Sequence, residues 1–170
     1  MLGRTDEPPT GDGIDACRAR AAKLEVDRVI ASDLTRASAA GAAIAGAHGL
    51  GCLIDPRWRE LDFGDWDGKT STDLDAQALG RFWDDPDACP PPQGERWSAL
   101  TARVAAAIGD LPTSPTLVVT HAGAMRAAVH LLCGIDRRAL WAFDFPYAAL
   151  LSLRLWPGEA ARAQIIGLQS

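Results

Sequence analysis

The stretch Thr116–Val129, TLVVTHAGAMRAAV, places a histidine between two different kinds of segment. Residues 116–120 are apolar and β-rich, as in a buried strand, and residues 123–133 are typical of a helix. His121 stands at the joint, and Ala122-Gly123 let the backbone turn sharply and let a ligand approach it. Open α/β sheets present their chemistry at such joints. The stretch indicates either an anion site at a helix N-terminus or a histidine that caps the helix or fills space.

The rest of the chain alternates between helix-prone and strand-like segments. Helices are expected at 13–25, 34–47, 72–84, 95–109 and 123–133, and strands at 26–31, 52–54, 116–120, 148–156 and 163–168. This alternation predicts an α/β fold with a mainly parallel sheet. A short Pro-Gly turn between the last two strands predicts an antiparallel C-terminal edge. Without an internal repeat or a long linker, residues 1–170 are expected to form a single domain.

Composition and charge exclude some classes of function. The chain has 170 residues, 48% hydrophobic and 23% charged, with a net charge of -5. This charge argues against a general nucleic-acid or anionic-membrane surface, but a few arginines in one pocket can still bind a small anion. The cysteines are widely spaced, without a zinc-binding pattern, and are expected to be reduced, mostly buried thiols: Cys17, Cys52, Cys89 and Cys133. With a polar N-terminus and no long apolar run, a cytoplasmic protein is expected.

Two more stretches carry residues suited to phosphate chemistry. In Ala31–Ala37, ASDLTRA, Arg36 lies in the first turn of an expected helix, where a cation is unfavourable unless it meets a bound phosphate. The alternative is a solvated surface arginine. In Trp58–Gly68, WRELDFGDWDG, carboxylates lie beside aromatic rings. Such a carboxyl group can have a raised pKa and act as a general acid, or the tryptophans can simply anchor a loop whose acids face water.

Taken together, SDLTRA, RELDFGDWDG and VVTHAGAMRA resemble the histidine phosphatase superfamily, the phosphoglycerate mutase-like fold. The initial GRTDEPPT and the later QGERW are similar to segments of its α-ribazole phosphatase-like branch. The resemblance implies a three-layer α/β/α fold with a mainly parallel sheet. It also implies a phosphomonoesterase that hydrolyses a small phosphorylated metabolite through a phosphohistidine, needs no metal or organic cofactor, and serves cobalamin biosynthesis.

The resemblance assigns a role to each matching residue. Arg36 matches the arginine that clamps the phosphate, and Glu60 the acid that protonates the leaving oxygen. His121 matches the second active-site histidine, which contacts the transferring phosphoryl group. The N–H of Ala122 is implied as a further oxyanion contact, and Arg4 as a substrate contact.

One motif of the family does not occur in residues 1–170. It is Arg-His-Gly after the first strand, whose histidine attacks phosphorus. His48 and His130 stand where the family does not place its nucleophile. We therefore expect a fold that lacks the first strand, whose neighbours include the strands at about 28–31 and 117–120. These neighbours are expected to be left unpaired, unless the sheet collapses to close the gap or a partner supplies a strand. Little activity is expected in the chain as it stands.

Three functions follow from these observations. The first is a phosphomonoesterase whose gene begins further upstream than the start codon assigned to it. The second is a non-catalytic descendant that binds phosphorylated ligands or serves as an interaction module. The third, an unrelated α/β hydrolase, is disfavoured because neither Gly-x-Ser-x-Gly nor a phosphate loop is present. The natural substrate and self-association into a homodimer are left open.

Overall fold

The computed structural model of the chain describes residues 1–156 and 162–170. Helices and strands alternate along it as the sequence predicts. The helices are α1 (Gly11–Ala21), α2 (Thr35–Ala47), α3 (Ala76–Asp84), α4 (Trp97–Gly109) and α5 (Ala122–Cys133). The strands are β1 (Arg28–Ala31), β2 (Cys52–Ile54), β3 (Thr116–Val119), β4 (Leu150–Trp156) and β5 (Arg162–Gln169). Short 3₁₀ turns are η1 (Pro56–Trp58), η2 (Gly64–Trp66), η3 (Ser71–Asp73) and η4 (Arg138–Ala142).

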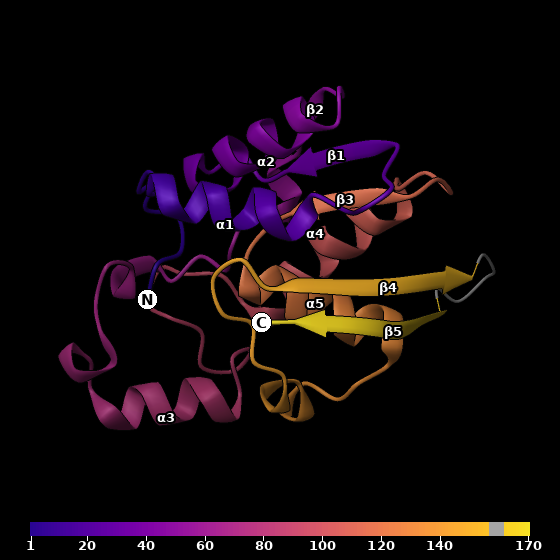
Figure 1. The fold of residues 1–170 in the computed structure, drawn as a ribbon. Helices are drawn as coiled ribbons and strands as arrows, with labels where there is room; N and C mark the ends of the chain where they lie inside the picture. Colours follow the sequence, from indigo (N-terminus) through magenta and orange to yellow (C-terminus); the bar gives the residue numbers. More distant parts are fainter. Residues whose placement is uncertain (157–161) are drawn as a thin grey trace.

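A three-stranded parallel sheet in the order β2-β1-β3 forms the centre of the fold. Helices α1 and α2 cover one face of this sheet, and α4 and α5 lie on the other side (Figure 1). The central strand is apolar because both of its faces are covered, and Val29 and Ala31 are fully buried. Helix α2 approaches the sheet closely at Gly41, where a Cβ would lie 2.7 Å from that of Ala31. These layers confirm the predicted α/β/α fold with a mainly parallel sheet.

The C-terminal strands form a separate antiparallel pair. Residues from Leu150 to Trp156 pair with residues from Gln169 back to Arg162, which confirms the antiparallel C-terminal edge. The Pro-Gly turn expected between them lies outside the described residues. One cluster of buried side chains, Val129, Leu140 and Phe145, connects α5 with the chain that leads into β4.

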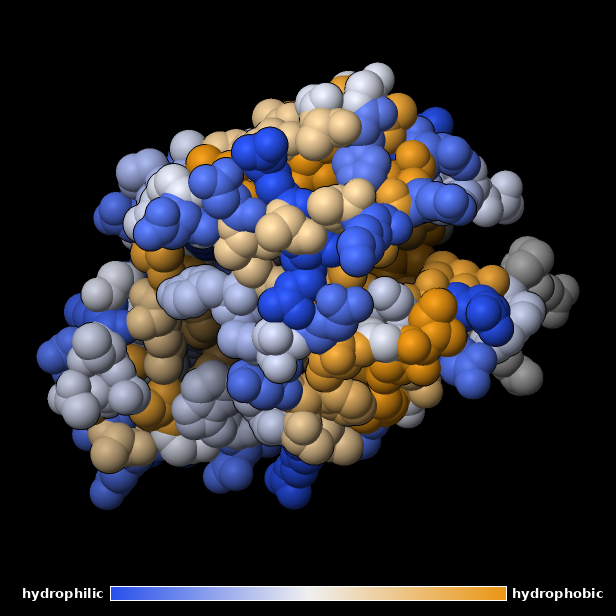
Figure 2. Space-filling model, in the orientation of Figure 1, coloured by the Kyte–Doolittle hydropathy of each residue, from blue (hydrophilic) through white to orange (hydrophobic). Residues whose placement is uncertain are grey.

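The position of the open strand edges differs from the expectation. Strand β1 pairs directly with β3, from Arg28 with Thr116 to Ala31 with Val119, so the expectation of a missing strand between 28–31 and 117–120 is wrong. Because β1 is bonded on both sides, the edges without a partner among the described residues belong to β2, β3, β4 and β5, and the open edges of β3 and β4 face each other (Figure 1). Figure 2 shows a notch with hydrophobic walls where these two strands face each other.

Local signals explain the smaller differences at helix ends. Helix α1 begins two residues earlier than expected because the Thr10 hydroxyl accepts a hydrogen bond from the Gly13 N–H, 3.1 Å away. The expected helix at 72–84 is divided, since the Asp75 carboxylate caps a new N-terminus by accepting from the Ala78 N–H.

The four cysteines are free thiols, each half-buried rather than mostly buried. Among the helices of the described chain, none is long and apolar enough to cross a membrane.

Candidate functional site

The predicted acid and the predicted histidine meet at the N-terminus of α5. Glu60 lies in the loop after η1, and one of its carboxyl oxygens, Oε2, accepts a hydrogen bond from the Gly123 N–H at 3.1 Å. The other oxygen, Oε1, accepts from the Leu61 N–H at 2.7 Å. His121 is the N-cap residue of the same helix. The free N–H groups and positive end of α5 therefore face both residues.

Gly123 is the residue that lets Glu60 come so close to the helix. A Cβ on Gly123 would overlap the Oε1 atom of Glu60 and lie 3.1 Å from its Cδ. The glycine of the VVTHAGAMRA stretch is therefore required by this close approach rather than by backbone conformation. It makes room for a carboxyl group against the first turn of α5.

The surroundings of Glu60 favour its protonated form. Burial raises its pKa above the ordinary value of 4.5, while the N–H groups of Gly123 and Leu61 and the charges of Arg36 and Arg103 act in the opposite direction. The outcome is a raised pKa. A carboxyl group with a raised pKa holds its proton more readily and can deliver that proton to a leaving oxygen.

His121 is held as a neutral imidazole. It is 9% exposed, and burial lowers its pKa to about 3, with further lowering by the charges of Arg36 and Arg103. Its Nε2 atom is buried and has no hydrogen-bond partner among the described residues. A buried polar atom without a hydrogen-bond partner lowers the stability of the fold. A phosphoryl oxygen bound beside His121 would supply that partner.

Arg36 lies in the first turn of α2, as the sequence predicts, and its charge acts on both Glu60 and His121. Its guanidinium is also bound to the N-terminal segment. It donates to the carbonyls of Gly3 and Thr5, at 2.6 and 2.8 Å. Arg36 therefore joins the N-terminal segment to the site.

A second anchor holds the same N-terminal segment in place. The Asp67 carboxylate accepts hydrogen bonds from the backbone N–H groups of Gly3, Arg4 and Thr5 at 2.8, 2.7 and 2.8 Å. Burial would raise the pKa of Asp67, but these three donors outweigh it and lower the pKa. The Arg4 side chain lies 3.9 Å from the Asp62 carboxylate and 4.0 Å from that of Glu95. Arg4 thus contacts the acidic loop rather than His121.

Arg103 is a site residue that the sequence did not reveal. Its guanidinium donates to the backbone carbonyls of Arg57, Arg59 and Glu60, at 2.7, 2.8 and 2.9 Å. It also forms a two-point ion pair with Glu95, with N–O distances of 2.8 and 2.9 Å. One side chain of α4 thereby fixes the backbone that carries Glu60.

Two further contacts join the three motif stretches. The Arg59 guanidinium is paired with the Asp33 carboxylate, with an Nε–Oδ1 distance of 2.6 Å. The Thr120 hydroxyl donates to the Trp58 carbonyl at 2.6 Å. The stretches that contain Arg36, Glu60 and His121 are therefore bonded to one another.

The other two histidines lie outside this site. The His48 ring contacts the Ala21 carbonyl at 3.2 Å, where α2 ends beside α1. The His130 ring contacts the Ile135 carbonyl at 2.8 Å and packs against Trp97. Both rings fill structural positions. Ala122, in contrast, is the first residue of α5 and lies beside Glu60.

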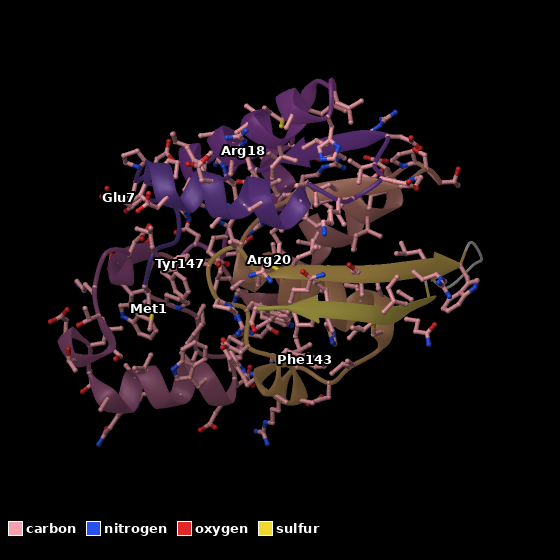
Figure 3. The ribbon with its side chains drawn as sticks, in the orientation of Figure 1. Met1, Glu7, Arg18, Arg20, Phe143 and Tyr147 are labelled. Carbon is pink, nitrogen blue, oxygen red and sulfur yellow. The ribbon has the colours of Figure 1, made fainter. Side chains whose placement is uncertain are left out.

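A cavity of about 210 Å³ opens beside the acid. Glu60, Ala122 and Gly123 contribute to its wall, and most of the remaining wall is apolar. Arg126, one turn further along α5, also faces it. The Arg126 guanidinium stacks 4.4 Å from the centre of the Trp141 ring. It also donates to the carbonyl of Phe143, which directly follows η4 and is labelled in Figure 3.

Comparison with known proteins places the chain in a family. The model of the histidine phosphatase superfamily (branch 1) matches residues 1–165. The probable phosphoglycerate mutase GpmB of Enterobacter sp. (strain 638) is 33% identical over 158 residues, which cover 82% of this chain and 69% of that protein. The adenosylcobalamin/alpha-ribazole phosphatase of Salmonella typhimurium (strain LT2) is 28% identical over 151 residues, covering 83% and 75%.

Solved structures show the same similarity. The mycobacterial glucosyl-3-phosphoglycerate phosphatase in complex with inorganic phosphate superposes with a TM-score of 0.81 at 26% identity, covering 97% of this chain and 88% of that one. The chain belongs to the histidine phosphatase superfamily, branch 1. Its relatives include phosphatases and mutases that act on small phosphorylated molecules.

Proposed function

We propose that this site is that of a phosphomonoesterase of the α-ribazole phosphatase-like branch, acting through a phosphohistidine. The observation that carries the proposal is the pairing of Glu60 with the N-terminus of α5 beside His121. The acid has a raised pKa, and the imidazole is neutral with an unpartnered Nε2. This combination suits binding of a phosphoryl group and protonation of its leaving oxygen.

Each predicted residue then has a defined task. The phosphoryl oxygens lie at the N-terminus of α5, where the Ala122 N–H and the His121 imidazole face them. Arg36 adds positive charge from α2. Glu60 gives its proton to the leaving oxygen as the bond to phosphorus breaks, and the resulting carboxylate takes a proton from the water that hydrolyses the phosphohistidine. Arg4 contacts the substrate from the N-terminal segment.

The attacking histidine is the group that residues 1–170 do not supply. His48 and His130 are bonded elsewhere. A strand that paired in parallel with the open edge of β3 would end beside His121, because parallel strands end at the same edge of a sheet. We infer that such a strand carries the nucleophile, and that residues 1–170 alone bind phosphate without turning it over.

A second candidate is a non-catalytic module that binds phosphorylated ligands or partners. It is favoured by the same missing histidine. In-frame codons immediately upstream that encode a strand-like run ending in Arg-His-Gly would support the enzyme, and their absence would support the binding module.

The assay uses the chain of residues 1–170 and an upstream-extended chain. Residues 1–170 should bind inorganic phosphate in calorimetry, and Arg36→Gln should weaken that binding, while an aryl phosphate at mildly acidic pH should not be turned over. The extended chain should recover turnover, with Glu60→Gln slowing poor leaving groups most. The proposal would be overturned if residues 1–170 showed robust turnover, if His121→Ala abolished that turnover, and if no other residue formed a phosphoenzyme.

The finer assignments rest on the relatives. The similarity to the Salmonella enzyme supports a cobalamin precursor as the substrate, whereas the similarity to GpmB supports a phosphoglycerate. Comparing the kcat/KM of the extended chain for α-ribazole phosphate and for a phosphoglycerate would separate the two assignments. We further propose one domain over residues 1–170, a cytoplasmic location and, as one expected state, a homodimer. Fractionation and sedimentation measure the last two.

A further inference from the structure

The cavity beside Glu60 has an aromatic wall that the proposed phosphate chemistry does not require. Five aromatic side chains line it: Phe63, Phe82, Trp83, Trp97 and Trp141. Four of these rings form a continuous series of contacts, with Phe63 6.3 Å from Phe82, Phe82 4.7 Å from Trp83 and Trp83 4.6 Å from Trp141 between ring centres. Ordinary core packing explains the buried Phe82, but it does not explain the exposed members.

The two tryptophans nearest solvent are incompletely covered. Trp83 is 38% exposed and Trp141 is 50% exposed, although both line the same cavity. Tryptophan is among the side chains that contribute most when a surface becomes buried by a ligand. The pair therefore offers a face on which a ring can stack.

Arg126 adds a planar cation to this face. Its guanidinium lies 4.4 Å from the Trp141 ring centre and 5.3 Å from that of Phe145. Its Nε atom is buried without a partner among the described residues. Burial also lowers the pKa of Arg126. The stacked guanidinium holds Trp141 in a fixed orientation, and its flat face suits an electron-rich ring.

The location of the cavity determines which part of a substrate enters it. Glu60 and Gly123 belong to its wall, and Glu60 is the group proposed to protonate the leaving oxygen. A phosphoester whose bridging oxygen lies at Glu60 places its leaving group against the aromatic wall. The volume of about 210 Å³ admits a group of the size of one or two rings.

We propose that Trp141 and Trp83 make this cavity select phosphomonoesters whose leaving group carries a planar aromatic ring. This inference rests on the proposed function, because it takes Glu60 as the general acid. It assigns Trp141 and Trp83 to substrate selection and gives Arg126 the role of positioning Trp141. None of the three takes part in binding the phosphate.

The test compares phenyl phosphate with cyclohexyl phosphate, which matches it in charge and size but not in planarity. Calorimetry on residues 1–170 should give phenyl phosphate an affinity about fivefold higher, the fold-change expected for one aromatic stacking contact. Trp141→Leu should remove this difference and leave the affinity for methyl phosphate unchanged. The matched control is Trp156→Leu on β4, where the tryptophan is 49% exposed and outside the cavity wall; it should change neither affinity.

A second measurement does not depend on a variant that folds. With 5-fluorotryptophan incorporated, the signals of Trp83 and Trp141 should shift in the ¹⁹F spectrum on addition of phenyl phosphate and not of methyl phosphate. Equal affinity for phenyl and cyclohexyl phosphate, or unshifted signals at saturation, would overturn this inference while leaving phosphate binding intact. Loss of binding for all the phosphates, or binding that Arg36→Gln does not weaken, would instead overturn the proposed function.

Discussion

Gly123→Ala should separate the chemistry of the site from the stability of the fold. The added Cβ would overlap Oε1 of Glu60 and lie 3.1 Å from its Cδ, so the carboxyl group must leave the helix N-terminus. The obstructing atoms are at the end of a flexible side chain, which can swing aside. The lost hydrogen bond costs about 1 kcal/mol. Alanine in a helix regains roughly 0.5–1 kcal/mol over glycine, so the free energy of unfolding should change by less than about 1 kcal/mol.

The displaced Glu60 should titrate differently. Burial raises its pKa in the folded chain, so its stabilising contribution is present below its unfolded value of 4.5 and is lost as pH rises through the folded pKa. In Gly123→Ala the carboxyl group moves toward solvent and its pKa should fall toward the ordinary value. Carbon-13 NMR of the glutamate carboxyl groups measures this, with Glu60→Gln identifying the signal.

The functional effect should be much larger than the effect on stability. General acid catalysis contributes about 10²–10⁴-fold to rate, so turnover of a poor leaving group by the extended chain should fall by at least about 10²-fold. The control is Gly80→Ala on α3, where a Cβ would meet nothing within 4 Å. An unchanged Glu60 pKa together with unchanged turnover in Gly123→Ala would refute the reasoning.

Three more substitutions test other parts of the site. Because the folded imidazole of His121 has a low pKa, the free energy of unfolding of the wild type should fall by at most about 1.4 kcal/mol per pH unit as pH falls from 6.5 toward 3. His121→Gln should make this fall smaller. Urea unfolding across this pH range measures it, with His48→Gln as the control. Arg103→Lys should lower the free energy of unfolding by about 3 kcal/mol, because lysine lacks the forked guanidinium that binds three backbone carbonyls and Glu95. An unchanged midpoint of urea unfolding would contradict this prediction. Asp67→Asn should loosen residues 2–6 and speed their proteolysis above pH 4, where the wild-type carboxylate is ionised. Equal cleavage rates in the variant and the wild type would show that the Asp67 carboxylate does not anchor this segment.

The sequence predicts the parts of the fold that depend on local pattern. The apolar run before His121 and the periodic run after Gly123 identify a strand and a helix without reference to the rest of the chain. Their joint forms the site because parallel strands end at a common edge. The confirmed antiparallel edge follows in the same way from two strand-like runs close together in the chain.

The order of the strands and the supporting contacts could not be predicted in this way. Strand β1 and strand β3 are separated by α2, α3 and α4 in sequence, and nothing local indicates that they pair. Arg103 acts on backbone carbonyls of another segment, which carry no side-chain signal. The close approach of Gly123 to Glu60 becomes apparent only when both stretches are placed in space.

Within the described part of the chain, strand β3 is paired on one side only, so its amide hydrogens fall into two classes: those that point toward β1 and those that point toward the open edge. The carbonyls of Pro115 and Val119 accept hydrogen bonds from Asp27 and Ser32, so these residues point toward β1. Successive residues of a strand point to alternate sides, which directs the N–H groups of Thr116 and Val118 away from β1. In hydrogen exchange these two amides should be fast and Leu117 slow, and their protection would report directly on any strand that comes to pair there.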